Sequence, residues 1–178
     1  MKAFVTWPLL LFVVLLDVVT KRVAEAMLPG VGLTRPFLGE TVRFTLVYNP
    51  GAAFGLYLGA YSRWIFIVLT TGALIILWRL YRQTMQEDLT RAVAIGLVAA
   101  GAIGNLIDRM RNSLGVVDFI DIGFAEHRWP TFNIADMAVS GGAFLLAYVL
   151  WGEEQAAPAD AAVDPAPADK RTDAREIL

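Results

Sequence analysis

The stretch Phe132-Asn133-Ile134-Ala135-Asp136 opens an apolar segment that continues to Gly152, and Asp136 is the only charged residue within it. About 20 apolar residues are enough to cross the hydrocarbon core of a bilayer as a helix. An ionisable side chain inside such a segment is costly, so it marks a candidate functional site. The stretch therefore predicts a membrane-spanning helix with a functional carboxylate near its start.

Three further segments have a similar length and apolar character. The first segment starts near Phe4 and runs past Val19. The second covers Tyr61 to Trp78, and the third covers Ala92 to Ile107. The whole chain is 57% hydrophobic and only 18% charged, whereas soluble domains carry about 25% charged residues. We therefore predict one α-helical membrane unit with four transmembrane helices, covering residues 1–152.

The first apolar segment has a second interpretation as a cleaved signal peptide. Lys2 provides a charged start, and Ala24-Glu25-Ala26 resembles a small-residue cleavage site. However, Asp17, Lys21 and Arg22 lie between the apolar run and that site. Such charges are not typical of a signal peptide, so an uncleaved membrane span is favoured.

The two loops that follow the first and third spans contain predicted β-structure. Residues Thr41 to Tyr48 alternate between apolar and polar types, which indicates a half-buried strand. Asn49-Pro50-Gly51 then predicts a turn, and the small apolar residues Ala52 to Leu58 are expected to form a short interfacial helix. The second loop contains a predicted strand at Val116 to Ile122, which carries Asp118.

The composition excludes several other classes of site and leaves the orientation open. The absence of Cys excludes a thiol nucleophile and a disulfide framework, and the single His127 excludes a multi-histidine zinc site. A net charge of -2 argues against a nucleic-acid partner. Basic residues divide almost evenly between the two sides, so the positive-inside rule gives no orientation. Residues 153–178 are rich in Ala, Pro and Asp, which predicts a disordered tail.

Asp118 and Asp136 are predicted to form a proton-sharing pair. Asp118 has two Val before it and Phe-Ile after it, so desolvation is expected to raise its pKa. Asp136 starts a helix, where the helix dipole favours the ionised form. Environments that push two carboxyl groups in opposite directions are typical of an acid and a base.

Each of these acids also has a purely structural interpretation. Asn133 and Asp136 have the spacing of a capping box, which satisfies the first free N–H groups of a helix. Asp118 could be an ordinary surface acid in a loop, although its apolar neighbours make this less favourable. The capping interpretation for Asp136 gives no account of Asp118.

Other polar residues occur on one face of the third span and near it. Gly101, Asn105 and Arg109 are spaced four residues apart and share a helical face. Gly101 and Gly104 are best explained by close helix packing, whereas a buried Asn needs a partner, so Asn105 is interpreted as functional together with Arg109. Asp17 and Lys21 are also four apart and are interpreted as a simple ion pair.

Five short motifs of the chain resemble those of one known family, the bacterial lipoprotein signal peptidases, also called signal peptidase II. In order, they are Asp17-Val18-Val19-Thr20-Lys21, Asn49-Pro50-Gly51-Ala52-Ala53-Phe54-Gly55, Gly101-Ala102-Ile103-Gly104-Asn105-Leu106-Ile107-Asp108-Arg109, Val116-Val117-Asp118-Phe119 and Phe132-Asn133-Ile134-Ala135-Asp136. The resemblance covers Phe4 to Trp151. Any one motif is weakly specific, but five in this order between four spans are highly specific.

The resemblance implies an aspartyl peptidase of the bacterial inner membrane. Such an enzyme removes signal peptides from prolipoproteins by cutting just before a diacylglyceryl-modified Cys. The implied fold is a four-helix membrane bundle with a small extracytoplasmic β-cradle and an interfacial helix. Both termini are then expected in the cytoplasm, with the active site facing outward. Within this resemblance the expected catalytic residues are Asp118 and Asp136, and the expected substrate-binding residues are Asn49, Asn105, Arg109 and Asn133.

The expected partners are diacylglyceryl-modified prolipoproteins and membrane lipids, with the enzyme acting as a monomer and without a metal or other cofactor. Two rival functions remain at this stage. A proton channel would use Asp118 and Asp136 as a relay, but it predicts carboxylates spread through the membrane depth. A non-catalytic assembly factor would use the glycines for packing, and it predicts no need for Asp118.

Overall fold

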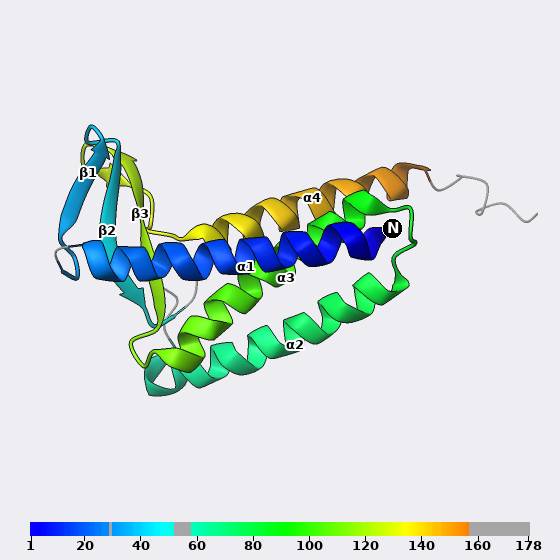
Figure 1. The fold of residues 1–178 in the computed structure, drawn as a ribbon, viewed down its shortest axis with the longest axis horizontal. Helices are drawn as coiled ribbons and strands as arrows, with labels where there is room; N and C mark the ends of the chain where they lie inside the picture. Colours follow the sequence, from blue (N-terminus) through cyan, green and yellow to red (C-terminus); the bar gives the residue numbers. More distant parts are fainter. Residues whose placement is uncertain (29, 52–57, 157–178) are drawn as a thin grey trace, which may run out of the picture.

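A computed structural model describes residues 1–28, 30–51 and 58–156 of the chain. Within these residues, long helices form an elongated bundle with a small sheet at one end (Figure 1). The long helices are α1 (Lys2–Met27), α2 (Ser62–Gln83), α3 (Leu89–Arg111) and α4 (Ile134–Ala156). Each of the four is long and apolar enough to cross a membrane, which confirms the four spans predicted from the sequence.

The helices extend beyond the predicted apolar segments because their polar ends continue the same backbone hydrogen bonding. Helix α3 begins at Leu89, where the Asp88 carboxylate accepts a hydrogen bond from the Arg91 N–H at 3.0 Å. Helix α4 continues to Ala156, four residues past the predicted end at Gly152. Residues 157–178, which are most of the predicted tail, lie outside the described part of the chain.

The sheet is antiparallel, with the strand order β1-β2-β3-β4. Its strands are β1 (Thr34–Leu38), β2 (Val42–Asn49), β3 (Val116–Phe124) and β4 (His127–Arg128). Strands β2 and β3 match the two strands predicted at Thr41 to Tyr48 and Val116 to Ile122. The short helix expected over Ala52 to Leu58 falls almost entirely on residues 52–57, which lie outside the described residues.

Helix α3 lies at the centre of the bundle, and small residues allow its neighbours to approach closely. A Cβ atom at Gly101 would overlap the Ala135 carbonyl oxygen of α4 and lie 2.7 Å from Cγ2 of Val139. At Gly142 in α4, a Cβ would lie 2.8 Å from the Ala94 carbonyl oxygen. These contacts confirm the packing role predicted for Gly101, and they fix α4 against α3.

A short bridge connects the start of α4 to the sheet. The Phe132 N–H donates to the Ile120 carbonyl at 3.0 Å, and the Ile120 N–H donates back to Phe132 at 2.8 Å. The same Phe132 carbonyl accepts from the Phe119 N–H at 3.1 Å. Because Phe132 lies only two residues before Ile134, the first residue of α4, this bridge places the first turn of the helix beside the middle of β3.

Candidate active site

The candidate site lies where β3, the last turns of α3 and the first turn of α4 meet, at the sheet end of the bundle (Figure 1). The structure brings together all six residues that the sequence singled out for catalysis or binding. They are Asn49, Asn105, Arg109, Asp118, Asn133 and Asp136. Their contacts define two carboxylates held in different ways and a set of amide and guanidinium groups around them.

Asp118 projects from β3 into a buried position and is only 3% exposed. Its Oδ1 accepts a hydrogen bond from Asn133 Nδ2 at 2.6 Å, and its Oδ2 accepts one from Asn49 Nδ2 at 3.2 Å. Burial raises the pKa of Asp118 to about 7, with the negative charge of Asp136 adding to the effect. The two amide donors oppose this shift but do not reverse it.

Asp136 lies in the first turn of α4, and its carboxylate accepts two hydrogen bonds. Oδ1 accepts from Asn105 Nδ2 at 2.8 Å, and Oδ2 accepts from the Asn133 backbone N–H at 3.2 Å. In return, the Asp136 N–H donates to Asn133 Oδ1 at 2.9 Å. This reciprocal arrangement is a capping box, so the structural interpretation of Asp136 is correct for one of its carboxylate oxygens. The capping box uses Oδ2, while Oδ1 accepts from Asn105.

Two asparagine side chains connect the two carboxylates. Asn133 Nδ2, which donates to Asp118, also lies 3.2 Å from Asn105 Oδ1. Asn105 in turn donates to Asp136. Asn133 is fully buried, and a buried amide needs partners for both of its ends. The two carboxylates are therefore parts of one hydrogen-bonded network, which spans β3, α3 and α4.

Asn49 and Arg109 hold the turn that borders this network. Asn49 Oδ1 accepts from the Gly51 N–H at 3.0 Å, so Asn49 is a turn residue as well as a donor to Asp118. Arg109 Nη2 donates to the Gly51 carbonyl at 2.7 Å, and its guanidinium lies 5.3 Å from the centroid of the Phe66 ring. Arg109 also interacts electrostatically with Asp136 and Asp118. In this structure its fork holds the turn.

Gly115 allows the same turn to lie against the start of β3. Its φ is +114°, in the region that favours glycine. A Cβ there would lie 2.5 Å from the Asn49 carbonyl carbon and 2.8 Å from Cα of Pro50. A side chain at Gly115 would therefore displace the turn and with it the amide that bonds to Asp118.

A buried cation supports the site from α1, and the sequence interpretation underestimated it. Lys21 Nζ lies 2.8 Å from Asp17, 2.9 Å from Asp108 and 2.9 Å from Asn105 Oδ1. Lys21 and Asp17 are 1% and 0% exposed. The expected simple ion pair is thus a larger cluster that orients Asn105. Its signal in the sequence was the presence of two opposite charges in one turn of an otherwise apolar span.

The acids of this cluster connect the helices to the site. Asp17 Oδ1 accepts from the Ala135 N–H at 2.8 Å, so α1 caps the start of α4. Asp108 Oδ2 accepts from the Val117 N–H at 3.2 Å, next to Asp118. A Cβ at Gly104 would overlap the Asp17 carboxylate. The packing role predicted for this glycine is therefore confirmed, and the group that packs against it includes a carboxylate.

Within residues 1–28, 30–51 and 58–156, no group of three or more His, Asp or Glu side chains is arranged to hold a metal ion. The polar groups of the site are mostly amides and a guanidinium. Such groups donate hydrogen bonds to carbonyl and carboxylate oxygens. The network is therefore suited to holding a peptide backbone beside two carboxyl groups.

Four membrane-spanning helices, with a buried and a half-buried carboxylate linked beside a small sheet, define an integral membrane protein with a polar site at one end. Its sequence matches the family model described as signal peptidase (SPase) II over residues 9–151. The chain therefore belongs to the signal peptidase II family, and it is a multi-pass bacterial membrane protease for the signal peptides of prolipoproteins.

Individual relatives agree with this membership. A lipoprotein signal peptidase of Polynucleobacter necessarius subsp. necessarius (strain STIR1) is 40% identical over 146 residues, covering 80% of this chain and 85% of the relative. One from Teredinibacter turnerae (strain ATCC 39867 / T7901) is 42% identical over 156 residues, covering 85% and 90%. A solved structure of a bacterial membrane enzyme superimposes with a TM-score of 0.78 at 32% identity, covering 87% of this chain and 92% of the other.

Proposed function

We propose that this protein is an aspartic endopeptidase of the bacterial inner membrane that cuts prolipoproteins just before their diacylglyceryl-modified Cys. Asp118 and Asp136 are the catalytic residues in this proposal. The observation that carries it is the linkage of these two carboxylates through Asn133 and Asn105, with one carboxyl group desolvated and the other at a helix start. Paired carboxyl groups in contrasting environments can act as acid and base.

The proposed reaction assigns a different task to each carboxyl group. Asp136, ionised at the start of α4, accepts a proton from a water molecule as that water attacks the scissile carbonyl carbon. Asp118 carries the shared proton, because burial raises its pKa to about 7. It donates a hydrogen bond to the carbonyl oxygen and stabilises the charge that develops there. Collapse of the tetrahedral intermediate then breaks the C–N bond, and the carboxyl pair passes the proton taken from the water to the leaving amine.

The surrounding polar residues bind the substrate backbone in this proposal. The two carboxylates accept hydrogen bonds from the side-chain amides of Asn49, Asn105 and Asn133. A bound peptide would share these amide donors and acceptors. Arg109 holds the Gly51 carbonyl, so it fixes the turn that borders the bound peptide and adds a positive charge beside the pair. The sequence resemblance assigns the same four residues to substrate binding.

The placement of the site supports a cut at the membrane surface. The sheet and the start of α4 lie at the end of the bundle opposite the N-terminus (Figure 1). Asp118 is on β3 of this sheet, and Asp136 is in the first turn of α4. A diacylglyceryl group on the substrate Cys would remain in the lipid and hold the scissile bond at this level. We propose that this end faces outward, that both termini are cytoplasmic, and that the protein acts as a monomer.

The decisive experiment is cleavage of a diacylglyceryl-modified prolipoprotein by the purified protein in detergent. Mass spectrometry of the products identifies the bond that is cut, and we expect the mature product to begin at the lipidated Cys. The matched control is the same prolipoprotein without the lipid, which we expect to be cut poorly. Cleavage at another bond, or equal cleavage of both substrates, would contradict the proposed cut site.

A second arm tests the chemistry. Asp118→Asn and Asp136→Asn should remove cleavage while each variant still purifies as a folded protein. Reconstituted vesicles with a pH-sensitive dye test the rival proton channel. Proton flux that requires both acids, without cleavage of the lipidated substrate, would replace the peptidase proposal with a transport function.

A further inference from the structure

An apolar groove lies in the part of the bundle that is distant from the carboxylates. It has a volume of about 210 Å³ and is formed by α1, α2 and α3. The residues that line it are Thr6, Trp7, Leu10, Leu74, Leu77, Trp78, Tyr81, Ile95, Gly96, Ala99 and Ile103. Along α3 it extends from Ile95 to Ile103, which is about 12 Å at 1.5 Å per residue. No polar group of the candidate site takes part in it.

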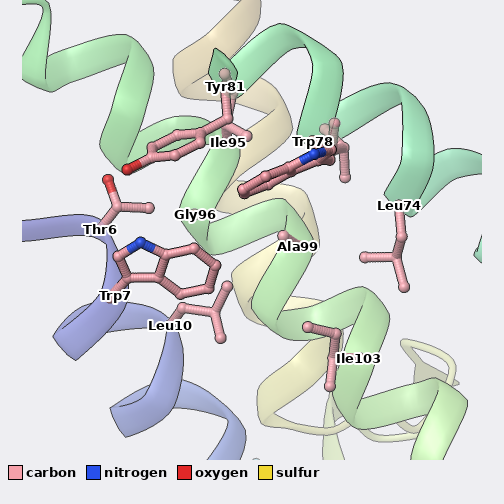
Figure 2. Close-up of a pocket in the computed structure, with 11 residues that line it drawn as sticks. Thr6, Trp7, Leu10, Leu74, Trp78, Tyr81, Ile95, Gly96, Ala99 and Ile103 are labelled. Carbon is pink, nitrogen blue, oxygen red and sulfur yellow. The ribbon is translucent and has the colours of Figure 1, made fainter. Parts of the chain in front are cut away.

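One end of this groove is built from three aromatic rings. Trp7 of α1 and Trp78 of α2 lie on opposite sides of the α3 surface at Gly96 and Ala99, and Tyr81 lies beside them (Figure 2). The Trp7 and Trp78 ring centroids are 6.2 Å apart, and Trp78 stacks on Tyr81 at 5.8 Å. Aromatic residues with one polar edge are typical of the membrane–water interface, so this end of the groove lies at the membrane surface.

Two cations lie against these rings, and they differ in what they can bind. Lys2 is buried, lies 4.6 Å from the Tyr81 ring centroid, and donates to the carbonyls of Tyr81 and Thr84. It therefore joins the start of α1 to the end of α2. Arg82 is exposed and lies 5.7 Å from the Trp78 ring centroid. Its guanidinium is therefore beside the aromatic cluster and exposed.

We propose that this groove binds one acyl chain of an anionic phospholipid, and that Arg82 contacts the phosphate of its headgroup. The groove lies within membrane-spanning helices, so the molecules that surround it are lipids. Its apolar lining fits a hydrocarbon chain, and the aromatic rim fits the junction between chain and headgroup. A guanidinium is well suited to bidentate contact with phosphate, and this charge complementarity selects an anionic lipid.

The bound acyl chain would lie between α1 and α2 and contact both helices. Across the groove these helices meet through Trp7 and Trp78, while Gly96 and Ala99 of α3 form the floor. Filling the groove adds contacts that are present only in the folded bundle, so the lipid stabilises the folded state. The inference does not depend on the proposed cleavage reaction, because binding and stability are measured without substrate.

The test is native mass spectrometry and thermal unfolding of the delipidated protein in detergent, titrated with phosphatidylglycerol or phosphatidylcholine. We expect one phosphatidylglycerol to bind at least tenfold more tightly than phosphatidylcholine and to raise the unfolding temperature. Ala99→Phe fills the floor of the groove and should lower the affinity at least tenfold. Val68→Phe is the matched control, because Val68 is 70% exposed on α2 and does not line the groove.

A second variant keeps the test decisive if Ala99→Phe does not fold. Arg82→Gln changes only an exposed side chain, and it should remove the preference for phosphatidylglycerol while leaving acyl-chain binding. Arg35→Gln, an exposed arginine on β1 at the opposite end, should bind like the wild type. Equal binding of both lipids by the wild type, or unchanged preference in Arg82→Gln, would overturn the proposal. Displacement of the lipid by a prolipoprotein would assign the groove to the substrate, and a lipid-free dimer would assign it to a second copy.

Discussion

Asp118 and Asp121 lie three residues apart on the same strand, and their surroundings are opposite in character. Asp121 accepts hydrogen bonds from Arg43, Thr45 and Arg128 at 2.8 to 3.1 Å. Among the residues that the structure describes, Asp118 accepts hydrogen bonds from two neutral amides, those of Asn49 and Asn133. Burial alone would raise the pKa of Asp121, but the hydrogen bonds from Arg128, Arg43 and Thr45 outweigh it and lower that pKa.

This comparison shows that low exposure does not determine what a carboxyl group does. Asp118 and Asp121 are 3% and 5% exposed, but Asp121 is covered by the guanidinium groups that neutralise it. The Asp121 carboxylate on β3 binds Arg43 of β2 and Arg128 of β4, so its charge holds these three strands together. The hydrogen bonds that Asp118 accepts from described residues come from neutral amides. Burial outweighs these amides and the opposing charge of Lys21, so the Asp118 proton remains available near neutral pH. Perturbed groups of that kind are typical of functional sites.

The largest difference between the two acids should appear in catalysis. Asp118→Asn and Asp136→Asn should each lower the rate of prolipoprotein cleavage by about 10³-fold or more, because acid–base groups contribute roughly 10²–10⁴-fold. The double variant should be no worse than either single variant, since members of one catalytic unit are not additive. Asp121→Asn is the control and should keep most of its activity. A variant of Asp118 or Asp136 with near wild-type kcat would refute the assignment.

The next largest effect should come from the buried cation that supports the pair. Lys21→Met leaves Asp17 and Asp108 buried without their common partner, and breaking a buried ion pair costs about 3–5 kcal/mol. We expect a large decrease in the unfolding temperature and loss of activity. Arg22→Met, on the exposed side of the same helix turn, is the matched control. Equal unfolding temperatures for the two variants would show that Lys21 does not stabilise the site.

Sequence reasoning recovered the parts of the structure that depend on local pattern. The spans follow from long apolar runs, and β2 and β3 follow from alternation and their adjacent turns. Asn49, Asn105, Arg109, Asn133 and the two acids were identified because each polar type is out of place in its apolar or turn context, and because their motifs resemble a known family.

The rest depended on partners that are distant in sequence. Lys21 and Asn105 are 84 residues apart, and Arg43 and Asp121 are 78 apart, so no local pattern joins them. The same limit explains why Asp17 and Lys21 were interpreted as an isolated pair. It also explains why the contact between the Arg109 fork and the carbonyl of Gly51, which lies 58 residues away, was not predicted.

Removing the structural acid should affect stability more than activity. Asp121→Asn keeps the shape of the side chain but loses the charge that Arg43 and Arg128 share, so we expect a loss of about 1–3 kcal/mol. Chemical unfolding monitored by Trp fluorescence measures this change. Glu40→Gln is the control, because the Glu40 carboxylate is mostly exposed and its ion pair with Arg43 is long, at 3.6 Å. If cleavage falls more than stability in Asp121→Asn, the division between the two acids is wrong.

A smaller effect is expected where geometry matters but charge does not change. Arg109→Lys keeps the positive charge and loses the planar fork that reaches Gly51 and the Asn105 carbonyl. Loss of one such bond should lower kcat/KM about tenfold, which corresponds to about 1.4 kcal/mol. Arg63→Lys provides a comparison away from the two carboxylates. Arg63 is in the first turn of α2 and donates to the Arg109 and Met110 carbonyls. Wild-type kinetics in Arg109→Lys would leave only a charge role for that residue.

The smallest and most specific effect is a pH dependence of opposite sign for the two acids. Between a pH of about 3.8, the ordinary value for Asp, and about 7, the folded protein keeps the Asp118 proton that the unfolded chain has lost. The free energy of unfolding contributed by Asp118 therefore falls as pH rises through this window. Asp121 has a lowered pKa, so its contribution to the free energy of unfolding is present above pH 3.8 and is lost as pH falls below that value.

Unfolding temperatures measured from pH 3 to 8, a range of about five units, cover both effects. Asp118→Asn should remove only the pH dependence between about 3.8 and about 7. Asp121→Asn should remove only the pH dependence below about 3.8. Because cleavage needs the Asp118 proton, activity should also decline above pH 7 in the wild type and in Asp121→Asn alike. A slope in the first window that survives in Asp118→Asn would mean that another group carries the proton, and Asp136 would be the next residue to test.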